Sequence, residues 1–596
     1  MKMYLGLVDD ETPPCGYDRY IWLSERFVKG IGWCRRNNKK YEVLSENWKS
    51  NADLLEAESY LERVKKSILE YAALLLNEYH GTSYDGKEWG IAFGIWMDHF
   101  LCSYYDKYLR IKQITNCIEY DICVFDSAKI EVSLDAYDYA NLLFRSDAYH
   151  KYQYTLLLSE MNLENVWNKV YRDEYKRSQT EILYDNLPEY IKRFDEDYWK
   201  YKSKKKIQDR VTIQCPYIKF ELYRKIIENN YGYISGYFLN YFTQIRKKLS
   251  RKVDYAWRLK KTEKNINYSD EFMGLVCGIL KKELPITFVE EFDMIKSLSQ
   301  KNYQYAYQTK AIVYDAGEIF YNEIFKSYFM DMIYKNNIKI DIQHGSSYGL
   351  IAPWMQLKTE FSVCDVFFTS GWKGIGYYNK RFEVMPFIKF FRMRDVVNEY
   401  GSYILYVGYS APKNIFRTCN YDNNILKYKK EELKFFELLS DELKDQMVIR
   451  YPPNEILWMK EIDFEGVSKR IHFDYEENYY NSLRKAKLLI GEIFGTTIME
   501  AIFLNKPFII FQSPLEISTS DNSALYDEIH LMKECDLLAE SAENLSTIVS
   551  NAMVDIKRWW DDPKRKNVVE ILRSKYAYFP DDSDQIWINK IKKYCD

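Results

Sequence analysis

The sequence predicts an α/β protein with two Rossmann-like, doubly wound domains that face a cleft, and a large helical insertion in the N-terminal half. Short buried runs alternate with amphipathic stretches from residue 311 onward, and a second alternation opens at residue 403. Between these and the N-terminus, helical periodicity fills roughly residues 50–300. A chain of 596 residues is too long for one core, so we expect two domains, 1–395 and 396–596.

The N-terminal half begins as α/β and then turns helical. Tyr4 to Val8 is typical of a strand and leads into an acidic turn at residues 9–12. One apolar face then repeats at three- and four-residue steps through Leu54, Leu61, Val64, Ile68, Tyr71 and Leu75. A second helix is predicted from near Lys87 to about Lys112. We therefore expect the helical stretch to be an insertion in the first sheet domain.

The most informative segment is residues 310–349, which has the pattern of a βαβ unit. It delivers Gln343, His344 and Gly345 to the carboxyl end of a parallel strand, where ligands bind in open α/β sheets. Gly345 and Ser346 are small enough for backbone N–H groups to approach a ligand closely. The alternative, equally weighted from this segment alone, is that His344 only caps the strand.

The C-terminal domain has the pattern of a second doubly wound sheet, with the boundary near residues 390–402. Its predicted strands are 403–408, 447–451, 470–473, 488–490 and 508–511. Its predicted helices are near 428–440, 476–486 and 496–504. Ligands are expected at the carboxyl ends of these strands as well.

Residues 486–511 carry the second strong signal, a strand, a glycine, two threonines and a helix. Thr496 or Thr497 is a good N-cap, and Glu500 lies at capping-box distance, so a well-capped helix explains the pattern. The functional alternative is that the helix N-terminus and the two hydroxyl groups bind the phosphates of a nucleotide. Glu500 would then accept hydrogen bonds from ribose hydroxyls.

Arg450 follows a predicted strand of the same domain and could pair bidentately with a phosphate, although a surface ion pair is an equal alternative. The loop Gly408 to Lys413 is a weaker candidate for the same crevice. Asp9-Asp10 could mimic a metal-binding carboxylate pair, but it lies in the other domain. The sequence therefore predicts no metal site.

Composition narrows the class of protein. The chain is 47% hydrophobic and 29% charged, so it can bury sizeable cores. Its 84 Lys+Arg against 87 Asp+Glu gives no support for general nucleic-acid binding. We expect no signal peptide, no membrane-spanning helix and no disulfide framework, which favours a cytoplasmic chain.

Several motifs taken together resemble a known family. They are Gly32-Trp33-Cys34, Leu76 to Gly81, Gln343-His344-Gly345, Ser370-Gly371-Trp372, Arg450-Tyr451-Pro452, Thr496-Thr497 with Glu500, and Trp559-Trp560. In these motifs the chain resembles bacterial GT-B-type transferases of surface-polysaccharide gene clusters, often those for nonulosonic acids. Ser346-Ser347 replaces a Gly-Gly pair that is common in that family.

The resemblance implies a glycosyltransferase that moves a sugar from a nucleotide donor, with a CMP-activated ulosonic acid favoured, to a surface-glycan or lipid-linked acceptor. The acceptor would bind the N-terminal domain, and the catalytic candidates there are His344, Asp10 and Glu11. The residues predicted to bind the donor are Gln343, Gly345, Ser346, Arg450, Thr496, Thr497 and Glu500. No metal or separate cofactor is expected, and contact with the inner face of the membrane would come through the acceptor. A polyol-phosphate transferase and a non-catalytic nucleotide-sugar-binding protein are the alternatives.

Overall fold

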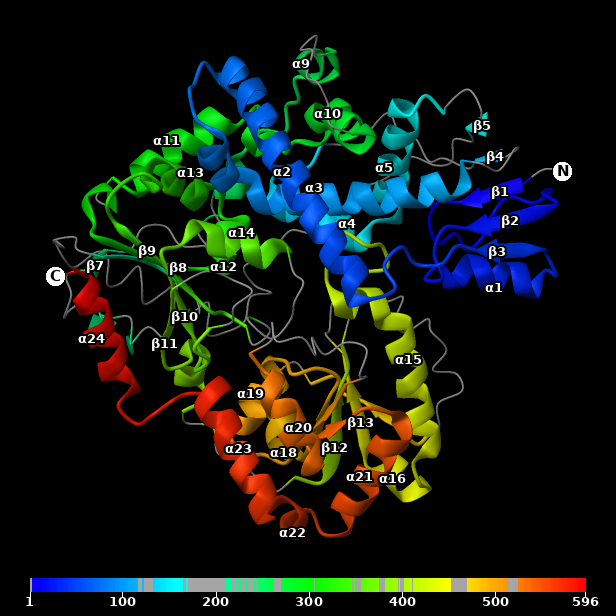
Figure 1. The fold of residues 1–596 in the computed structure, drawn as a ribbon, viewed down its shortest axis with the longest axis vertical. Coiled ribbons are helices and arrows are strands. Elements are labelled where there is room, and N and C mark those ends of the chain that lie inside the picture. Colours follow the sequence, from blue (N-terminus) through cyan, green and yellow to red (C-terminus); the bar gives the residue numbers. More distant parts are fainter. Residues whose placement is uncertain are drawn as a thin grey trace.

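The computed structural model describes residues 3–115, 121–122, 132–163, 168–169, 211–215, 221–222, 224–226, 232–233, 241, 245–261, 270–304, 306–345, 348, 355–374, 381–394, 396, 401–409, 411–451, 469–476, 478–512 and 524–595. These residues form three parallel β-sheets with helices packed around them (Figure 1). The α/β class with Rossmann-like parallel sheets is therefore confirmed.

The first sheet lies at the N-terminal end and has the strand order β3-β2-β1-β4-β5. Its strands are β1 (Met3–Gly6), β2 (Arg19–Trp22), β3 (Tyr41–Val43), β4 (Asp121–Ile122) and β5 (Asn168–Lys169). The second sheet has the order β11-β10-β9-β8-β6-β7. Its strands are β6 (Val211–Gln214), β7 (Gly232–Tyr233), β8 (Ala311–Asp315), β9 (Ile338–Ile342), β10 (Val366–Thr369) and β11 (Arg381–Val384).

The third sheet has the order β14-β13-β12-β15-β16-β17, and all its strand pairs are parallel. Its strands are β12 (Tyr403–Val407), β13 (Met447–Arg450), β14 (His472–Phe473), β15 (Ala486–Gly491), β16 (Phe508–Phe511) and β17 (Leu538–Ala539). The chain reverses its direction of winding between β12 and β15. In doubly wound sheets the ligand crevice lies at such a switch point, outside the carboxyl ends of the strands.

The arrangement of the N-terminal half differs from the sequence prediction. The predicted strand at residues 4–8 corresponds to β1, which belongs to a separate sheet and not to the sheet of β8 and β9. Within the stretch expected to be helical, β6 pairs with β8 and β7 pairs with β6. Strands of two to four residues leave too little alternation in the sequence to be recognised, and their pairing partners are remote.

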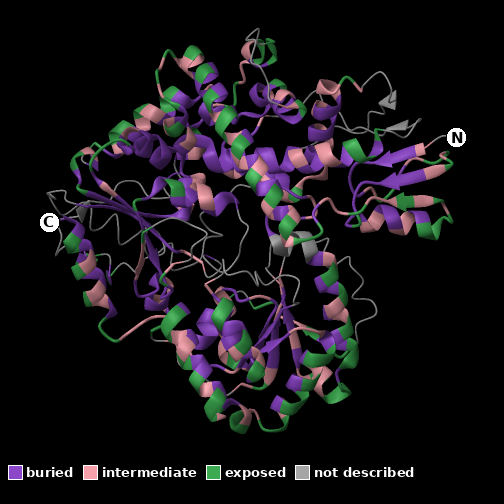
Figure 2. Cartoon of the chain, in the orientation of Figure 1, coloured by how far each residue is buried: buried purple, intermediate pink, exposed green. Residues whose placement is uncertain are grey.

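The helical stretch is dominated by a long antiparallel pair, α2 (Asn51–His80) and α3 (Gly86–Ile114), as the periodicity predicted. Each begins with a capping box, Ser50 with Asp53 and Asp85 with Glu88, which satisfies N–H groups of the first turn. Helix α3 is buried along most of its length, and Figure 2 shows it crossing the centre of the upper half of the molecule. It packs on α2, α4, α13 and α14.

The remaining helices surround the sheets. They are α1 (Val28–Arg36), α4 (Ala136–Arg145), α5 (Asp147–Glu160), α9 (Tyr255–Leu259), α10 (Glu271–Glu283), α11 (Phe292–Asn302), α12 (Ala316–Tyr321), α13 (Glu323–Met332), α14 (Met355–Val363), α15 (Asn420–Leu438), α16 (Asp441–Asp445), α18 (Tyr479–Lys485), α19 (Thr496–Phe503), α20 (Tyr526–Glu534), α21 (Ala542–Val554), α22 (Ile556–Trp560), α23 (Pro563–Tyr576) and α24 (Ser583–Cys595).

The last helix returns to the second sheet, although the sequence prediction placed residues 396–596 in one domain. Tyr578 N–H donates to Ser370 O at 3.0 Å, and Trp587 Nε1 donates to Pro386 O at 3.0 Å. The Trp587 ring also lies 5.7 Å from that of Phe368 on β10. Helix α24 therefore contributes to the core of the second sheet, so the chain passes between the second and third sheets more than once.

Candidate active site between the second and third sheets

The loop after β9 is held in shape by Gln343. Its Oε1 accepts hydrogen bonds from Ser370 N–H and from Trp372 Nε1, each at 2.9 Å. Its Nε2 donates to Gly345 O at 2.7 Å. Gln343 was predicted to contact the donor, but these bonds give it a structural task, because they fix the backbone on either side of His344. Ser346 lies outside the described residues.

His344 stands at the end of a buried hydrogen-bond relay. Its Nδ1 lies 2.7 Å from the hydroxyl oxygen of Tyr348, and that hydroxyl donates to Glu360 on α14 at 3.0 and 3.1 Å. With Glu360 ionised and the shared proton on Asp341, the Tyr348 proton is given to Glu360 and the Tyr348 oxygen accepts the Nδ1 proton of His344. This leaves Nε2 as the acceptor nitrogen, which is the tautomer a general base requires.

Burial sets the protonation of this relay. Desolvation, assisted by the positive charge of Lys389, lowers the pKa of His344 to about 3, so the imidazole is neutral at physiological pH. Desolvation also raises the pKa of Glu360 and, more strongly, that of Asp341 on β9. These two carboxyl groups face each other, and repulsion between them favours a shared proton over two charges.

Helices α2 and α3 position Glu360 by binding the preceding residue, Thr359. Thr359 Oγ1 donates to Asp98 Oδ2 of α3 at 2.6 Å and accepts from Lys65 Nζ of α2 at 2.5 Å. Lys65 and Asp98 also form an ion pair at 2.6 Å. The helical stretch therefore supports the site, because it fixes α14 and with it the acidic end of the relay.

The third sheet presents α19 to this relay. A Cβ atom built on Gly345 would lie 4.0 Å from Thr496 Oγ1, so the loop after β9 and the first turn of α19 face each other closely. The predicted N-cap was wrong. Gly495 is the N-cap residue and makes no side-chain cap, so Thr496 and Thr497 are the first two helical residues and their half-buried hydroxyl groups do not cap the helix.

Glu500 does not complete a capping box either. Its side chain is 5% exposed and accepts a hydrogen bond from Tyr480 at 3.1 Å. Desolvation raises its pKa to about 7, although the ammonium of Lys389 opposes this shift. Lys389, which the sequence analysis missed, also acts electrostatically on His344 and Asp315. It thus supplies positive charge where the second and third sheets meet.

The guanidinium of Arg450 is bonded to groups of the protein itself. It donates to Asp474 Oδ2 at 2.8 Å and to Glu476 O at 2.7 Å. Arg450 therefore forms an ion pair within the protein, which was the alternative to phosphate binding, but this pair is buried and does not lie at the surface. The interaction ties β13 to the segment after β14 and lowers the pKa of Asp474.

A buried charge network occupies the switch point of the third sheet. Glu492, directly after β15, accepts hydrogen bonds from Tyr406 Oη at 2.9 Å and from the N–H of Tyr409. Lys429 of α15 lies 3.7 Å from Glu492 and also pairs with Glu432. Gly408 is needed in this crevice because any Cβ there would collide with a tyrosine ring. Sequence reasoning missed Glu492, although its place after a strand-ending glycine was a usable signal.

Asp10 and Glu11 belong to the first sheet and have other partners. Asp10 Oδ1 accepts from Thr12 N–H at 3.1 Å, and Glu11 is exposed and pairs with Lys29 at 2.5 Å. That ammonium lowers the pKa of Glu11, which makes it a poorer base. The neighbouring Asp9 faces the third sheet, where it pairs with Lys413 at 3.3 Å. The geometry therefore favours His344 over either carboxylate as the base.

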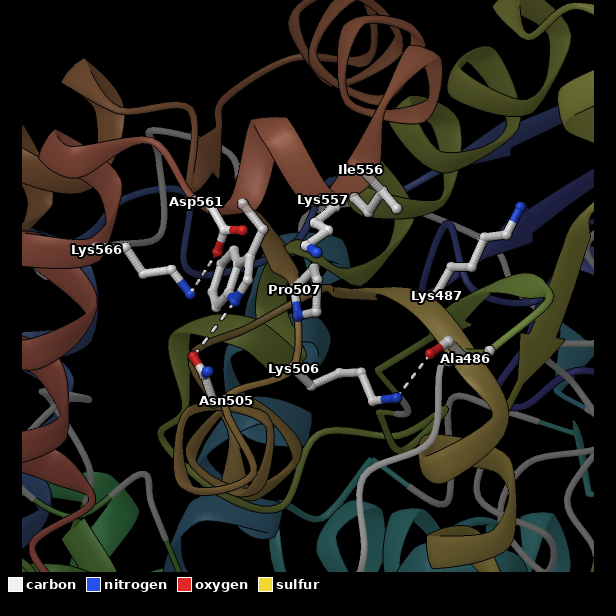
Figure 3. Close-up of a pocket in the computed structure, with 11 residues that line it drawn as sticks. Ala486, Lys487, Asn505, Lys506, Pro507, Ile556, Lys557, Asp561 and Lys566 are labelled. Atoms are coloured by element: carbon white, nitrogen blue, oxygen red, sulfur yellow. Dashed lines mark hydrogen bonds and ion pairs between the residues drawn. The ribbon is translucent and has the colours of Figure 1, made fainter.

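Two cavities lined by described residues lie away from the relay. One, of 280 Å³, lies at the amino ends of the third-sheet strands and is lined by Lys557, Lys566 and Trp560 among others (Figure 3). The second, of 470 Å³, lies between α1 and α15 and has Val28 and Leu433 in its lining. Neither cavity contains a predicted site residue.

Among the described residues, no three histidine, cysteine or carboxylate side chains form a group that could hold a metal ion. In the same part of the chain, no helix is both long and apolar enough to cross a membrane.

The second and third sheets thus meet at a site with a histidine relay on one side and a helix N-terminus on the other, the arrangement of an α/β protein with a site between two sheets. The profile of the LIC12162 family transferases matches residues 25–591, so this chain belongs to that family. No curated protein matches the chain.

Solved structures similar to the chain include several glycosyltransferases. SnogD from Streptomyces nogalater is 10% identical, with a TM-score of 0.32 over 64% of this chain and 99% of that one. HepE from Anabaena, in complex with UDP and glucose, is 9% identical, with a TM-score of 0.33 over 65% and 98%. MurG from Acinetobacter baumannii is 11% identical, with a TM-score of 0.28 over 51% and 79%. At these scores the likenesses carry no argument about mechanism.

Proposed function

We propose that this transferase is a glycosyltransferase that moves a sugar from a nucleotide donor to a surface-glycan acceptor, with a CMP-activated ulosonic acid as the donor. The observation that carries the proposal is the relay of His344, Tyr348 and Glu360, which faces the first turn of α19. We place the reaction in the cytoplasm, where the free cysteines of the described residues would stay reduced.

In this proposal His344 Nε2 removes the proton from the acceptor hydroxyl as that oxygen attacks the anomeric carbon. A pKa of about 3 makes the resting imidazole a weak base, so proton transfer must accompany bond formation and cannot precede it. The imidazolium that forms passes its positive charge towards Tyr348 and Glu360 through Nδ1–H. The acidic end of the relay therefore stabilises the charge that the reaction creates.

The leaving nucleotide phosphate would be stabilised by fixed groups. The N–H groups and hydroxyls of Thr496 and Thr497 lie at a helix N-terminus, which favours negative charge. Lys389, in the short helix Ile388–Arg392, adds an ammonium group nearby, although burial lowers its pKa. Such donors can replace a divalent metal in neutralising a departing phosphate, so we propose metal-independent transfer.

The test is a calorimetric titration of CMP and of UDP into the wild type and into a Thr496→Val/Thr497→Val variant. We expect CMP to bind the wild type more tightly than UDP, and the variant to lose about tenfold or more in affinity, since each charge-assisted hydrogen bond contributes about 1.5–3 kcal/mol. Thr547→Val, which removes a hydroxyl bonded to Glu543 O on α21, is the matched control and should bind as wild type. Equal affinity in all three proteins would refute the α19 site.

A further inference from the structure

The segment 245–261 is strongly basic in a chain that carries a formal net charge of only −3. Asp254 is its only acidic residue. Its exposed cations are Lys247, Lys248, Arg251, Lys252, Lys260 and Lys261. The two other arginines of the segment form ion pairs with the body of the protein, Arg246 with Asp135 at 2.6 Å and Arg258 with Glu290 at 2.6 Å.

Helix α9, within this segment, packs against the protein on one face and is exposed to solvent on the other. Trp257 packs on Tyr79 with ring centroids 4.8 Å apart, and Arg258 Nη1 donates to Leu284 O at 2.7 Å. Tyr255 and Leu259 are one helical turn apart and so share a face. They are 54% and 64% exposed. The inward anchors hold these two apolar side chains outward, beside the exposed lysines.

We propose that the face formed by Tyr255, Leu259 and the exposed cations of residues 247–261 is a membrane-docking surface for an anionic lipid bilayer. The lysines would lie over the acidic headgroups, and the tyrosine and leucine side chains would enter the boundary between headgroups and acyl chains. A polyanion such as RNA or an acidic protein would use the cations, but the exposed leucine beside them favours lipid. Figure 1 shows α9 well apart from β9, the strand that leads to His344, and the proposal does not depend on the transfer reaction.

The opposite end of the molecule provides a comparison. Figure 1 places α9 at one extreme and α22 at the other. There Val554 is 88% exposed, close in sequence to the exposed Lys557, Arg558 and Lys564. That region also carries Asp555, Asp561 and Asp562, which offset the positive charge. It has similar residue types without the excess of cations, so its variants are matched controls.

The experiment is co-sedimentation of the full-length protein with vesicles of equal parts phosphatidylglycerol and phosphatidylcholine, and with vesicles of phosphatidylcholine alone. We expect binding to the anionic vesicles only, and its loss between about 0.1 M and about 1 M salt, where the screening length falls from about 10 Å to about 3 Å. Lys247→Glu/Lys252→Glu/Lys260→Glu should lower the partition coefficient by more than about a hundredfold, since each ammonium contributes about fivefold and each new carboxylate is repelled by the anionic surface. Tyr255→Ser/Leu259→Ser should lower it about tenfold.

The controls are Lys557→Glu/Arg558→Glu/Lys564→Glu and Val554→Ser, which should bind as wild type. Equal loss in the control variants, or binding to neither vesicle, would overturn the proposal. Binding to heparin or RNA without binding to vesicles would also overturn it, and would identify the segment as a polyanion site. Because the readout is vesicle binding, a failure of the proposed transfer activity would leave this result unaffected.

Discussion

Replacing Tyr348 with phenylalanine removes one oxygen atom that contacts the buried Glu360 and the half-buried His344. The hydroxyl oxygen of Tyr348 lies 2.7 Å from His344 Nδ1 and donates to Glu360 at 3.0 and 3.1 Å. The variant leaves both partners without this contact, which costs about 1–3 kcal/mol at the buried Glu360 and about 1 kcal/mol at the half-buried His344, because water can reach the imidazole. We therefore expect the free energy for opening this part of the second sheet to fall by about 2–4 kcal/mol.

A matched substitution separates this effect from the loss of any buried hydroxyl. Tyr328 is also fully buried, and its hydroxyl donates to Ala306 O at 2.9 Å. That carbonyl keeps a second donor, Thr309 Oγ1, at 2.8 Å. Tyr328→Phe therefore leaves no acceptor unpaired and should cost only about 1 kcal/mol.

The assay is native-state hydrogen exchange, followed by mass spectrometry on peptides that cover β9, α14 and β10. Local exchange is preferable to a global unfolding curve because a chain with several sheets need not unfold in one transition. If α14 exchanges no faster in Tyr348→Phe than in Tyr328→Phe, the hydrogen bonds of Tyr348 do not stabilise this part of the fold and the reasoning is refuted. That result would also remove the argument that Glu360 orients His344.

Three further predictions concern the same site. His344→Ala should lower the transfer rate by about two to four orders of magnitude with little change in melting temperature, and a fully active variant would contradict its role as base. The pKa of His344 is about 3 in the folded chain and 6.5 ordinarily, so between pH 6.5 and pH 3 the unfolded chain binds a proton that the folded chain does not. The stability of the wild type should therefore fall as the pH drops through this range. In thermal unfolding scans, His344→Gln should show a smaller fall. Transfer should continue in excess EDTA, and activity that returns only with magnesium would point to an unplaced carboxylate site.

The sequence determined the elements that have strong local patterns. The periodic faces of α2 and α3, the βαβ unit that leads to His344, and the glycine and threonine pair at the start of α19 could all be predicted, because hydrophobic period and turn residues act within a few positions of one another. The same local rule misplaced one detail. Thr496 satisfies the composition of an N-cap, but Gly495 takes that position, and this choice depends on the backbone angle at which the chain leaves β15.

Only the tertiary structure decided which residues form the site. Glu360 joins His344 through Tyr348 from α14, and Lys389 acts on it electrostatically from the short helix Ile388–Arg392. Arg450 and Glu11 looked equally suitable in sequence, but each is paired with a nearby opposite charge. Whether a charged side chain is available to a ligand depends on its neighbours in space. Those neighbours come from strands and helices far apart in sequence, whose packing no local pattern records.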